Sequence, residues 1–158
     1  MISLIKSDQN KIEIEKNIMN SNPYFNFISI GREELTDDDL RKDHLEDKQI
    51  NKERYLVTYH DKHVGILEYT MYNPNDHAPW LGLLVIDKKY QNLGLGQLVY
   101  QEYEQEMIKR KATEIRLGCL VKNTEGFKFW SKQGFATYKE ILFDEKPLYC
   151  LKKHLGNK

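Results

Sequence analysis

The spacing of apolar positions changes several times along the chain, and each change predicts a new element. The apolar residues at 2–5 predict a short strand, and a partial apolar face over 10–19 predicts a helix. Pro23 ends that helix because proline cannot donate the next backbone hydrogen bond. Thr36 precedes three aspartates, a pattern typical of a helix N-cap, and predicts a short helix to about Leu45.

Strand-like alternation begins at Tyr55. Segments 55–60 and 63–72 are rich in β-branched and aromatic residues, and Asp61-Lys62 is predicted to join them as a tight hairpin turn. Every second residue of the later strand is expected on one face, which groups Glu68 with Val64, Ile66, Thr70 and Tyr72. The nearly continuous apolar run at 80–86 predicts a central strand buried on both faces.

Helical spacing returns after Gly94, where apolar residues recur every four positions and predict a helix over 94–111. The remaining pattern predicts a strand at 115–121, a helix at 123–132 and a final strand pair at 135–143 and 148–152. The predicted order is one strand, two helices, three strands, and then α, β, α, β, β. This order indicates a mixed α/β sheet with a strand–helix–strand crossover at its centre, in a single domain spanning 1–158.

Composition narrows the class of protein. Apolar residues make up 40 % of the chain and charged residues 30 %, which is typical of a globular protein rather than a disordered one. Lys plus Arg and Asp plus Glu each number 24, so the formal net charge is zero. A nucleic-acid-binding domain usually carries a basic excess, and we therefore expect no nucleic-acid partner.

The two cysteines and the apolar runs exclude further classes. Cys119 and Cys150 show no CxxC spacing, so we expect neither a disulfide framework nor a metal site. The N-terminal residues lack the apolar run of a signal peptide. No segment approaches the roughly 18 apolar residues that a membrane-spanning helix needs. We therefore expect no membrane association and a cytoplasmic location.

The loop before the long helix carries the clearest chemical signal. Gly94-Leu95-Gly96 opens that helix after a connection from the buried strand. The first amides of a helix lack partners and carry a partial positive charge, and glycine lets an anion approach the backbone closely. The pattern predicts a phosphate site formed by backbone amides. Two glycines at this spacing also occur at strand-to-helix turns that bind nothing, and that alternative stays open from the glycines alone.

Two nucleotide-binding motifs do not fit this loop. A dinucleotide fingerprint needs a third small residue where Val99 stands, and it needs the strand to end directly at the first glycine. Residues 87–93 intervene here. A Walker loop ends in Gly-Lys followed by Ser or Thr, and that ending is missing.

Two segments together resemble motifs of one family. Residues 86–96 resemble motif A of the GNAT superfamily of N-acetyltransferases, with its core Arg/Gln-x-x-Gly-x-Gly/Ala; they read Ile86-Asp87-Lys88-Lys89-Tyr90-Gln91-Asn92-Leu93-Gly94-Leu95-Gly96. Residues 123–135 resemble motif B, Asn-x-x-Ala-x-x-x-Tyr-x-x-x-Gly-Phe, through Asn123, Gly126, Phe127, Phe129, Trp130, Lys132, Gly134 and Phe135. The element order is also similar. The resemblance implies a GNAT-like acyl-CoA acyltransferase fold, mostly antiparallel, with splayed central strands.

The resemblance implies acetyl-coenzyme A as cosubstrate. The amides of the glycine loop would hold the pyrophosphate, and the backbone of the preceding strand would pair with the pantetheine arm. Asn123 would cap the next helix, bond to the cofactor, or do both. The implied cofactor-binding residues are Leu84, Val85, Ile86, Gln91, Asn92, Leu93, Gly94, Leu95, Gly96, Gln97, Asn123 and Trp130.

Catalytic residues are less clearly indicated. Direct attack of an amine on the thioester is expected, because neither cysteine has a neighbouring base or cation that would favour a thiolate. Trp130 stands where the family has an acidic tyrosine, and indole cannot give up a proton, so the acid is unassigned; Tyr138 and Tyr149 are alternatives. Glu68 is the candidate base, since desolvation among apolar neighbours would raise its pKa. A solvent-facing or lysine-paired Glu68 is the alternative.

The resemblance implies that the acceptor is an amine, unidentified here, of a small molecule or peptide. Its selection is expected in the least regular segments, 21–45 and 73–79. The resemblance also implies a possible homodimer, since GNAT proteins often dimerise through their later strands. The rival function is a non-catalytic acyl-CoA-binding sensor or interaction module, which Trp130 and the absence of an obvious base favour.

Overall fold

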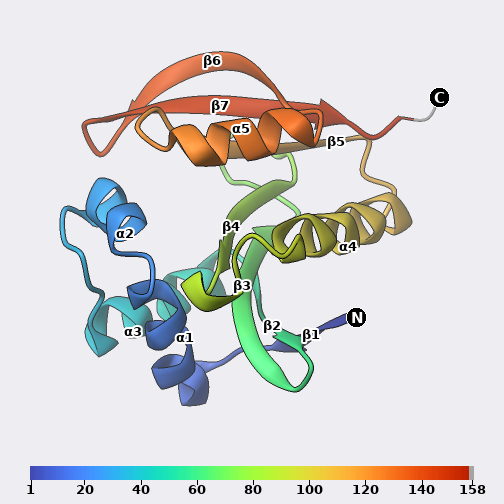
Figure 1. Ribbon diagram of the computed structural model, residues 1–158. Helices are drawn as coiled ribbons and strands as arrows, with labels where there is room; N and C mark the ends of the chain where they lie inside the picture. The colour runs from blue at the N-terminus through green and yellow to red at the C-terminus, as the bar shows by residue number, and fades with distance from the viewer. Residues whose placement is uncertain (157–158) are drawn as a thin grey trace.

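A seven-stranded sheet organises the computed structural model, which describes residues 1–156; the strand order is β1-β2-β3-β4-β5-β7-β6 (Figure 1). All neighbouring strands are antiparallel except β4 and β5, which are parallel and joined by a helical crossover. The predicted strands and crossover are confirmed. The bounds are β1 Ile2–Lys6, β2 Glu53–Tyr59, β3 Lys62–Thr70, β4 Trp80–Ile86, β5 Glu114–Leu120, β6 Ala136–Phe143 and β7 Lys146–His154.

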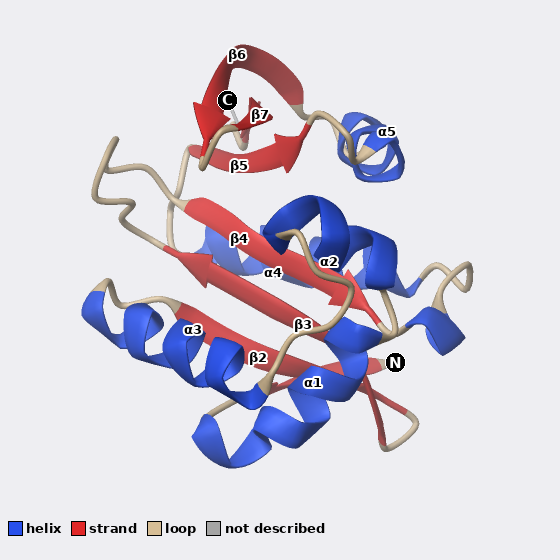
Figure 2. Cartoon of the chain, turned by 90° about the vertical axis from the view of Figure 1, so that its left-hand side faces the viewer, coloured by secondary structure: helices blue, strands red, loops and turns tan. Residues whose placement is uncertain are grey.

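Helices cover both faces of the sheet. In Figure 2, α1, α2 and α3 lie on the near face, and α4 lies on the far one. None of the helices within residues 1–156 has both the length and the apolar character to cross a membrane. The bounds are η1 Gln9–Lys11, α1 Ile12–Asn20, α2 Pro23–Ile30, α3 Asp37–Gln49, η2 Lys88–Tyr90, α4 Leu95–Lys109 and α5 Thr124–Lys132.

Three α-helices lie between β1 and β2, where two were predicted, and the additional one is α2. Pro23 ends α1 as expected, but it also begins α2, because the first turn of a helix has no need of the missing amide hydrogen. Gly31, with a φ of 80°, ends α2 in the left-handed conformation. The helix α3 begins at the predicted cap Thr36, whose hydroxyl accepts from the Asp39 amide, and runs beyond Leu45 to Gln49. Segment 21–45 is therefore mostly helical rather than irregular.

The strand β3 differs from its prediction in two ways, namely where it begins and which side chains share a face. The turn before β3 uses His60 and Asp61, both at positive φ, so Lys62 already belongs to the strand. A register shift between Val57 and Thr58 turns Val64 toward the α4 side, whereas Ile66 packs on the α1 side. The predicted common face of Val64 and Ile66 is therefore wrong, because a bulge changes the alternation of side chains.

The strands β4 and β5 separate after a short contact. They pair only at Trp80 with Arg116 and at Leu81 with Leu117. Beyond that point β4 continues beside β3, while β5 continues beside β7 and turns away (Figure 2). The expected splay is confirmed. It also shows that burial of 80–86 on both faces was a wrong prediction, because Gly82 is exposed where the strands part.

Candidate active site

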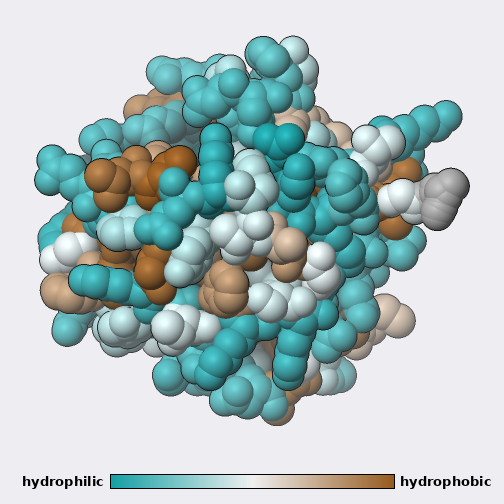
Figure 3. Space-filling model, turned by 90° about the horizontal axis from the view of Figure 1, so that it is seen from above, coloured by the Kyte–Doolittle hydropathy of each residue, from teal (hydrophilic) through white to brown (hydrophobic). Residues whose placement is uncertain are grey.

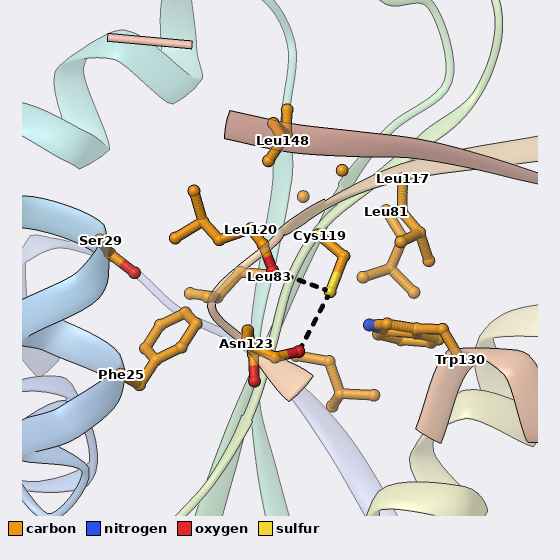
Figure 4. A pocket seen from close by; sticks show the side chains of 13 residues that line it. Phe25, Ser29, Leu81, Leu83, Leu117, Cys119, Leu120, Asn123, Trp130 and Leu148 are labelled. Carbon is orange, nitrogen blue, oxygen red and sulfur yellow. Dashed lines mark hydrogen bonds between the residues drawn. The ribbon is translucent and has the colours of Figure 1, made fainter. Parts of the chain in front are cut away.

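A cavity lies where β4 and β5 part (Figure 4). Its walls come from α2, β4, β5, α5 and β7, so segments far apart in the sequence meet there. Its lining side chains carry no formal charge. They are Phe25, Ser29, Leu81, Gly82, Leu83, Leu84, Leu117, Gly118, Cys119, Leu120, Asn123, Trp130 and Leu148.

The glycine loop presents unpaired backbone amides at the start of α4. Gly94 is the N-cap of this helix and has a φ of 81°, in the left-handed region that glycine favours. The Gln91 amide donates to the Lys88 oxygen and the Leu98 amide to the Gly94 oxygen. Within residues 1–156, nothing accepts a hydrogen bond from the amides of 92–97. This run of free donors at a helix N-terminus has the geometry of an anion site.

Gln91 braces this loop with its side chain. Its Nε2 donates to the Ile86 oxygen at 2.8 Å and to Asn22 Oδ1 at 2.7 Å, and Asn22 Nδ2 donates to the same Ile86 oxygen at 3.1 Å. These bonds hold the loop against the end of β4 and the junction of α1 with α2. Sequence reasoning missed Asn22, because it is 69 positions from Gln91 and belongs to no motif.

The predicted strand residues lie along the opening, but their side chains differ in position. Leu84 lines the cavity, whereas Val85 is buried on the α1 side and pairs with Ile66. The Ile86 oxygen is already occupied by the amides of Gln91 and Asn22. From Gly82 to Ile86, β4 has no strand partner on the β5 side in the part of the chain that the structure describes. This free edge is what a pairing pantetheine arm requires.

Asn123 caps α5 and also lines the cavity. Its Oδ1 accepts from the Gly126 amide at 2.9 Å, so the N-cap is confirmed, and the same side chain lines the cavity. A Cβ at Gly126 would lie 2.4 Å from Asn123 Nδ2. The glycine in place of the alanine of motif B therefore makes room for this cap.

Trp130 forms one wall of the cavity and is held rigidly. Its ring packs edge-on against Tyr100, Phe129 and Phe135, with centroids 5.8, 4.8 and 5.5 Å away. Only 9 % of its surface is exposed. Figure 4 shows its nitrogen directed into the cavity, toward Cys119. Neither of the tyrosines considered as acids, Tyr138 and Tyr149, lines this cavity.

Cys119 lies in the cavity as a protonated thiol. Burial raises its pKa to about 11. Its Sγ is 3.7 Å from the oxygens of both Leu120 and Asn123 (Figure 4). A thiol with this pKa is a poor nucleophile at neutral pH, which agrees with direct attack by the amine.

Glu68 lies in a buried charge cluster on the α1 side of the sheet. Arg54 Nη1 contacts Glu68, and Lys52 Nζ lies 3.4 Å from Glu68 Oε1. Burial acts to raise the pKa of Glu68, but Arg54 and Lys52 outweigh it and lower that pKa. The expected rise is therefore wrong, because the strand places a guanidinium directly opposite the carboxylate. Glu68 Oε1 nevertheless lies beside the cavity, 3.1 Å from where a Cβ at Gly82 would stand.

Asp47 is a carboxyl of this cluster whose pKa lies near neutrality. Burial and the neighbouring Glu68 raise the pKa of Asp47 to about 7. Its Oδ2 lies 3.4 Å from Arg54 Nη1, so Arg54 serves both Asp47 and Glu68. The sequence shows no sign of this, since Asp47 reads as one of many polar residues on α3.

A groove that shares Leu120 with the cavity lies where α2 meets the β6–β7 hairpin. Figure 3 shows apolar surface gathered on this side, and Phe27, Leu142 and Phe143 are among the exposed apolar residues of these elements. The groove combines apolar walls with charged residues at its rim. Its lining is Phe27, Ile28, Leu120, Lys122, Glu145, Lys146 and Pro147.

Solved structures of similar fold are acetyltransferases. An acetyltransferase from Thermus thermophilus has a TM-score of 0.82 at 18 % identity, covering 98 % of this chain and 97 % of its own. The Salmonella typhimurium enzyme that modifies the N-terminal serine of ribosomal protein L7/L12 has 0.81 at 13 %, covering 98 % and 95 %. Spermidine N-acetyltransferase from Vibrio cholerae, solved with CoA and spermine, has 0.76 at 13 %, covering 97 % and 95 %. At these identities the likeness shows the fold.

Sequence comparison supplies the family. No curated protein matches the chain. The family model described as Acetyltransferase (GNAT) family matches residues 22–135, a span that includes both motifs, the splayed strands and every cavity-lining residue except Leu148. Because this match covers well over half of the sequence, the chain belongs to the GNAT acetyltransferase family, and the predicted fold and enzyme class are confirmed.

Proposed function

We propose that residues 1–158 act as one acetyl-CoA-dependent N-acetyltransferase domain, which transfers acetyl directly from the thioester to an amine. The observation that carries this proposal is that three features of the site follow one another: the free amides, the free edge of β4 and the cavity. Free amides at 92–97 would take the pyrophosphate, and the free β4 edge would pair with the pantetheine arm. The cavity beyond Leu84 would then receive the thioester.

The proposed chemistry begins with the loss of a proton from the acceptor. An amine with a pKa of about 10 is an ammonium at neutral pH and cannot attack until it is deprotonated. Glu68 remains the proposed proton acceptor because it lies beside the cavity at Gly82. Its lowered pKa makes it a weak base, so we assign the proton to the Glu68–Asp47 pair, in which Asp47 has a pKa of about 7.

We infer that the acceptor is a peptide N-terminus or another amine on a neutral or apolar body. The groove beside the cavity is bordered by Lys122 and Lys146 against one carboxylate, Glu145. Two lysines at this rim would repel a polycation such as spermidine, whereas Phe27 and Pro147 would contact apolar groups. Both classes occur among proteins of similar fold, since one modifies an N-terminal serine and another acetylates spermidine.

A ligand-protection experiment tests the cofactor half of the proposal. Thermal unfolding would be followed with acetyl-CoA, CoA, ATP and NAD at equal millimolar concentration. A ligand at about 100 times its Kd stabilises a protein by about 2.7 kcal/mol, so acetyl-CoA and CoA should raise the Tm by several degrees while ATP and NAD should not. Equal protection by ATP would replace the proposal with general nucleotide binding.

An acceptor panel tests the transfer itself. CoA release from acetyl-CoA would be measured with N-terminal serine and alanine peptides, spermidine, an aminoglycoside and free amino acids. We expect the peptides to exceed spermidine. Tight acetyl-CoA binding without turnover on any acceptor would favour the alternative function, a non-catalytic acyl-CoA sensor, which Trp130 at the tyrosine position of motif B supports.

We also propose a homodimer through β6. This strand forms an edge of the sheet and exposes Ile141, Leu142 and Phe143. An edge strand offers unpaired backbone groups that a second copy can satisfy. Sedimentation equilibrium should give twice the monomer mass, and L142K should return the protein to a monomer.

A further inference from the structure

The cavity contains polar groups that the protein itself does not satisfy. The indole nitrogen of Trp130 points into the space between β4 and β5, and Figure 4 marks no hydrogen bond from it to any residue of the lining. On the opposite wall, the Ser29 hydroxyl of α2 is buried without a partner among residues 1–156. An indole N–H is a donor only, and that of Trp130 is open to the cavity, where an acceptor from a ligand or from water can meet it. The cavity therefore has the polarity of a site that receives a hydrogen-bond acceptor.

The other tryptophan shows what a satisfied indole looks like in this chain. Trp80 Nε1 donates to Asp76 Oδ1 at 3.0 Å and to Oδ2 at 2.8 Å. Trp80 lies where β4 and β5 still pair, whereas Trp130 lies where they have parted. The Trp80 N–H therefore already has its acceptor, whereas the Trp130 N–H faces the cavity, which a ligand can enter.

The direction of the Trp130 N–H is set before any ligand arrives. Tyr100, Phe129 and Phe135 contact the ring edge-on, and the residue is almost fully buried. A donor held in place by packing needs no reorganisation when charge develops on a reacting group. The lining offers no charged side chain that would compete for the same ligand atom.

We propose that the Trp130 Nε1–H donates a hydrogen bond to the thioester of bound acetyl-CoA and to the sulfur as it leaves. This inference rests on the proposed function. The amine nitrogen forms a bond to the carbonyl carbon, the carbon–sulfur bond breaks, and its electron pair moves to sulfur. The acceptor nitrogen loses two protons: the ammonium proton passes to the Glu68–Asp47 pair or to water before attack, and the second proton passes from the nitrogen to water as the amide forms. The indole stabilises the thiolate without transferring a proton, and the thiolate takes its proton from solvent after release.

This role differs from that of the acidic tyrosine in motif B. A coenzyme thiol with a pKa of about 8.5 can leave as a thiolate near neutral pH, provided that a donor stabilises its charge. Turnover should then show no loss at alkaline pH from ionisation of residue 130. Removing the N–H should lower kcat about tenfold, as expected for one hydrogen bond to a developing charge.

Nuclear magnetic resonance of the two indole N–H groups gives a test that needs no variant. Acetyl-CoA would be added to ¹⁵N-labelled protein, and the two indole signals would be followed with the backbone amides of 92–97. We expect the Trp130 signal to move downfield and the Trp80 signal, already bonded to Asp76, to stay. If the amides of 92–97 respond while the Trp130 indole does not, the inference is overturned and cofactor binding stands. If no signal responds, the proposed function fails as well.

Substitutions then separate the hydrogen bond from the packing. W130F keeps an aromatic ring but removes the donor, and we expect kcat to fall while CoA affinity changes less than about threefold. W130Y restores a donor and should recover turnover, with a new decrease above about pH 9 as the phenol ionises. W80F is the matched control, since Trp80 lies outside the cavity lining. Unchanged kcat in a folded W130F protein would overturn the inference.

Discussion

Two polar regions lie on either side of β4, and they differ in whether their groups have partners. Under α1 and α3, Arg54 lies among the carboxylates of Glu15, Asp47 and Glu68, all of them buried and in contact with it. Between β4 and β5, the amides of 92–97 and the hydroxyl of Ser29 have no partner within residues 1–156.

This difference indicates a structural role for the Arg54 cluster and a ligand-binding role for the groups between β4 and β5. A buried charge with partners stabilises the arrangement of helices around it, and loss of one partner leaves the others unpaired. A polar group without a protein partner in a native structure needs an explanation, and a bound ligand or water can supply the missing partner. Glu68 is an acidic residue among apolar ones in the sequence, but in the structure its partners are Arg54 and Lys52 of the buried charge cluster.

Removal of Arg54 tests the first region and should have the largest effect. R54M leaves Glu15, Asp47 and Glu68 buried without their shared cation, and we expect the free energy of unfolding to fall by about 3–5 kcal/mol. Urea denaturation at pH 7 measures this change. The control R41M removes an exposed arginine paired with Asp38 and should cost less than about 1 kcal/mol. Similar losses in both variants would show that the cluster is not a special source of stability.

A side chain in the glycine loop tests the second region. In G96V the branched side chain would stand between the free amides and the pyrophosphate, and we expect acetyl-CoA affinity to fall at least about 100-fold, or about 2.7 kcal/mol. A Cβ at Gly96 meets Phe129 at an ordinary 3.6 Å, so G96A should remain folded and lose less affinity than G96V. Calorimetric titration gives both values. Full affinity in G96V would reduce this loop to a turn.

Loss of the hydrogen bonds from the Gln91 side chain also tests the second region, with a smaller expected effect on acetyl-CoA affinity. Q91A removes the bonds from Gln91 to the Ile86 oxygen and to Asn22, so the loop must be ordered when the cofactor binds. We expect about a tenfold loss of acetyl-CoA affinity, or about 1.4 kcal/mol, with little change in stability. The matched control Q97A removes an amide side chain from the same helix start without these bonds. Equal losses in Q91A and Q97A would contradict the brace.

The pH dependence of stability tests the proton of Asp47. Burial and Glu68 raise its pKa in the folded protein to about 7, above its ordinary 3.8, while Arg54 and Lys52 act in the opposite direction. The folded state therefore holds a proton that the unfolded state loses between these values, and the associated stability disappears as pH rises through 7.

D47N should remove this dependence. An asparagine mimics the protonated carboxyl, so the variant should match the natural protein at pH 4 and exceed it by roughly 1 kcal/mol at pH 8, after allowance for solvent screening. Denaturation at both pH values measures this. D47N less stable than the natural protein at pH 8 would show that Asp47 acts there as a charged partner of Arg54.

Local signals in the sequence predicted much of the fold correctly. Thr36 and Asn123 were recognisable as helix caps because a cap depends on residues within a few positions. The helix α2 was missed because Pro23 reads both as an end and as a beginning, and only packing decides between them. The bulge that separates Val64 from Ile66 was missed because a register shift depends on the partner strand.

The glycine loop and the order of elements followed from the sequence by itself, because both depend on neighbouring residues and on spacing along one segment. The donor half of the proposed reaction is visible in that information. The partners of Glu68, the brace of Asn22 on Gln91 and the cavity around Trp130 and Ser29 were decided only by the tertiary structure. Each of them joins segments far apart in the chain. Burial and electrostatic interaction depend on distance in space, so the direction of a pKa shift or the loss of a hydrogen-bond partner appears only once those segments meet.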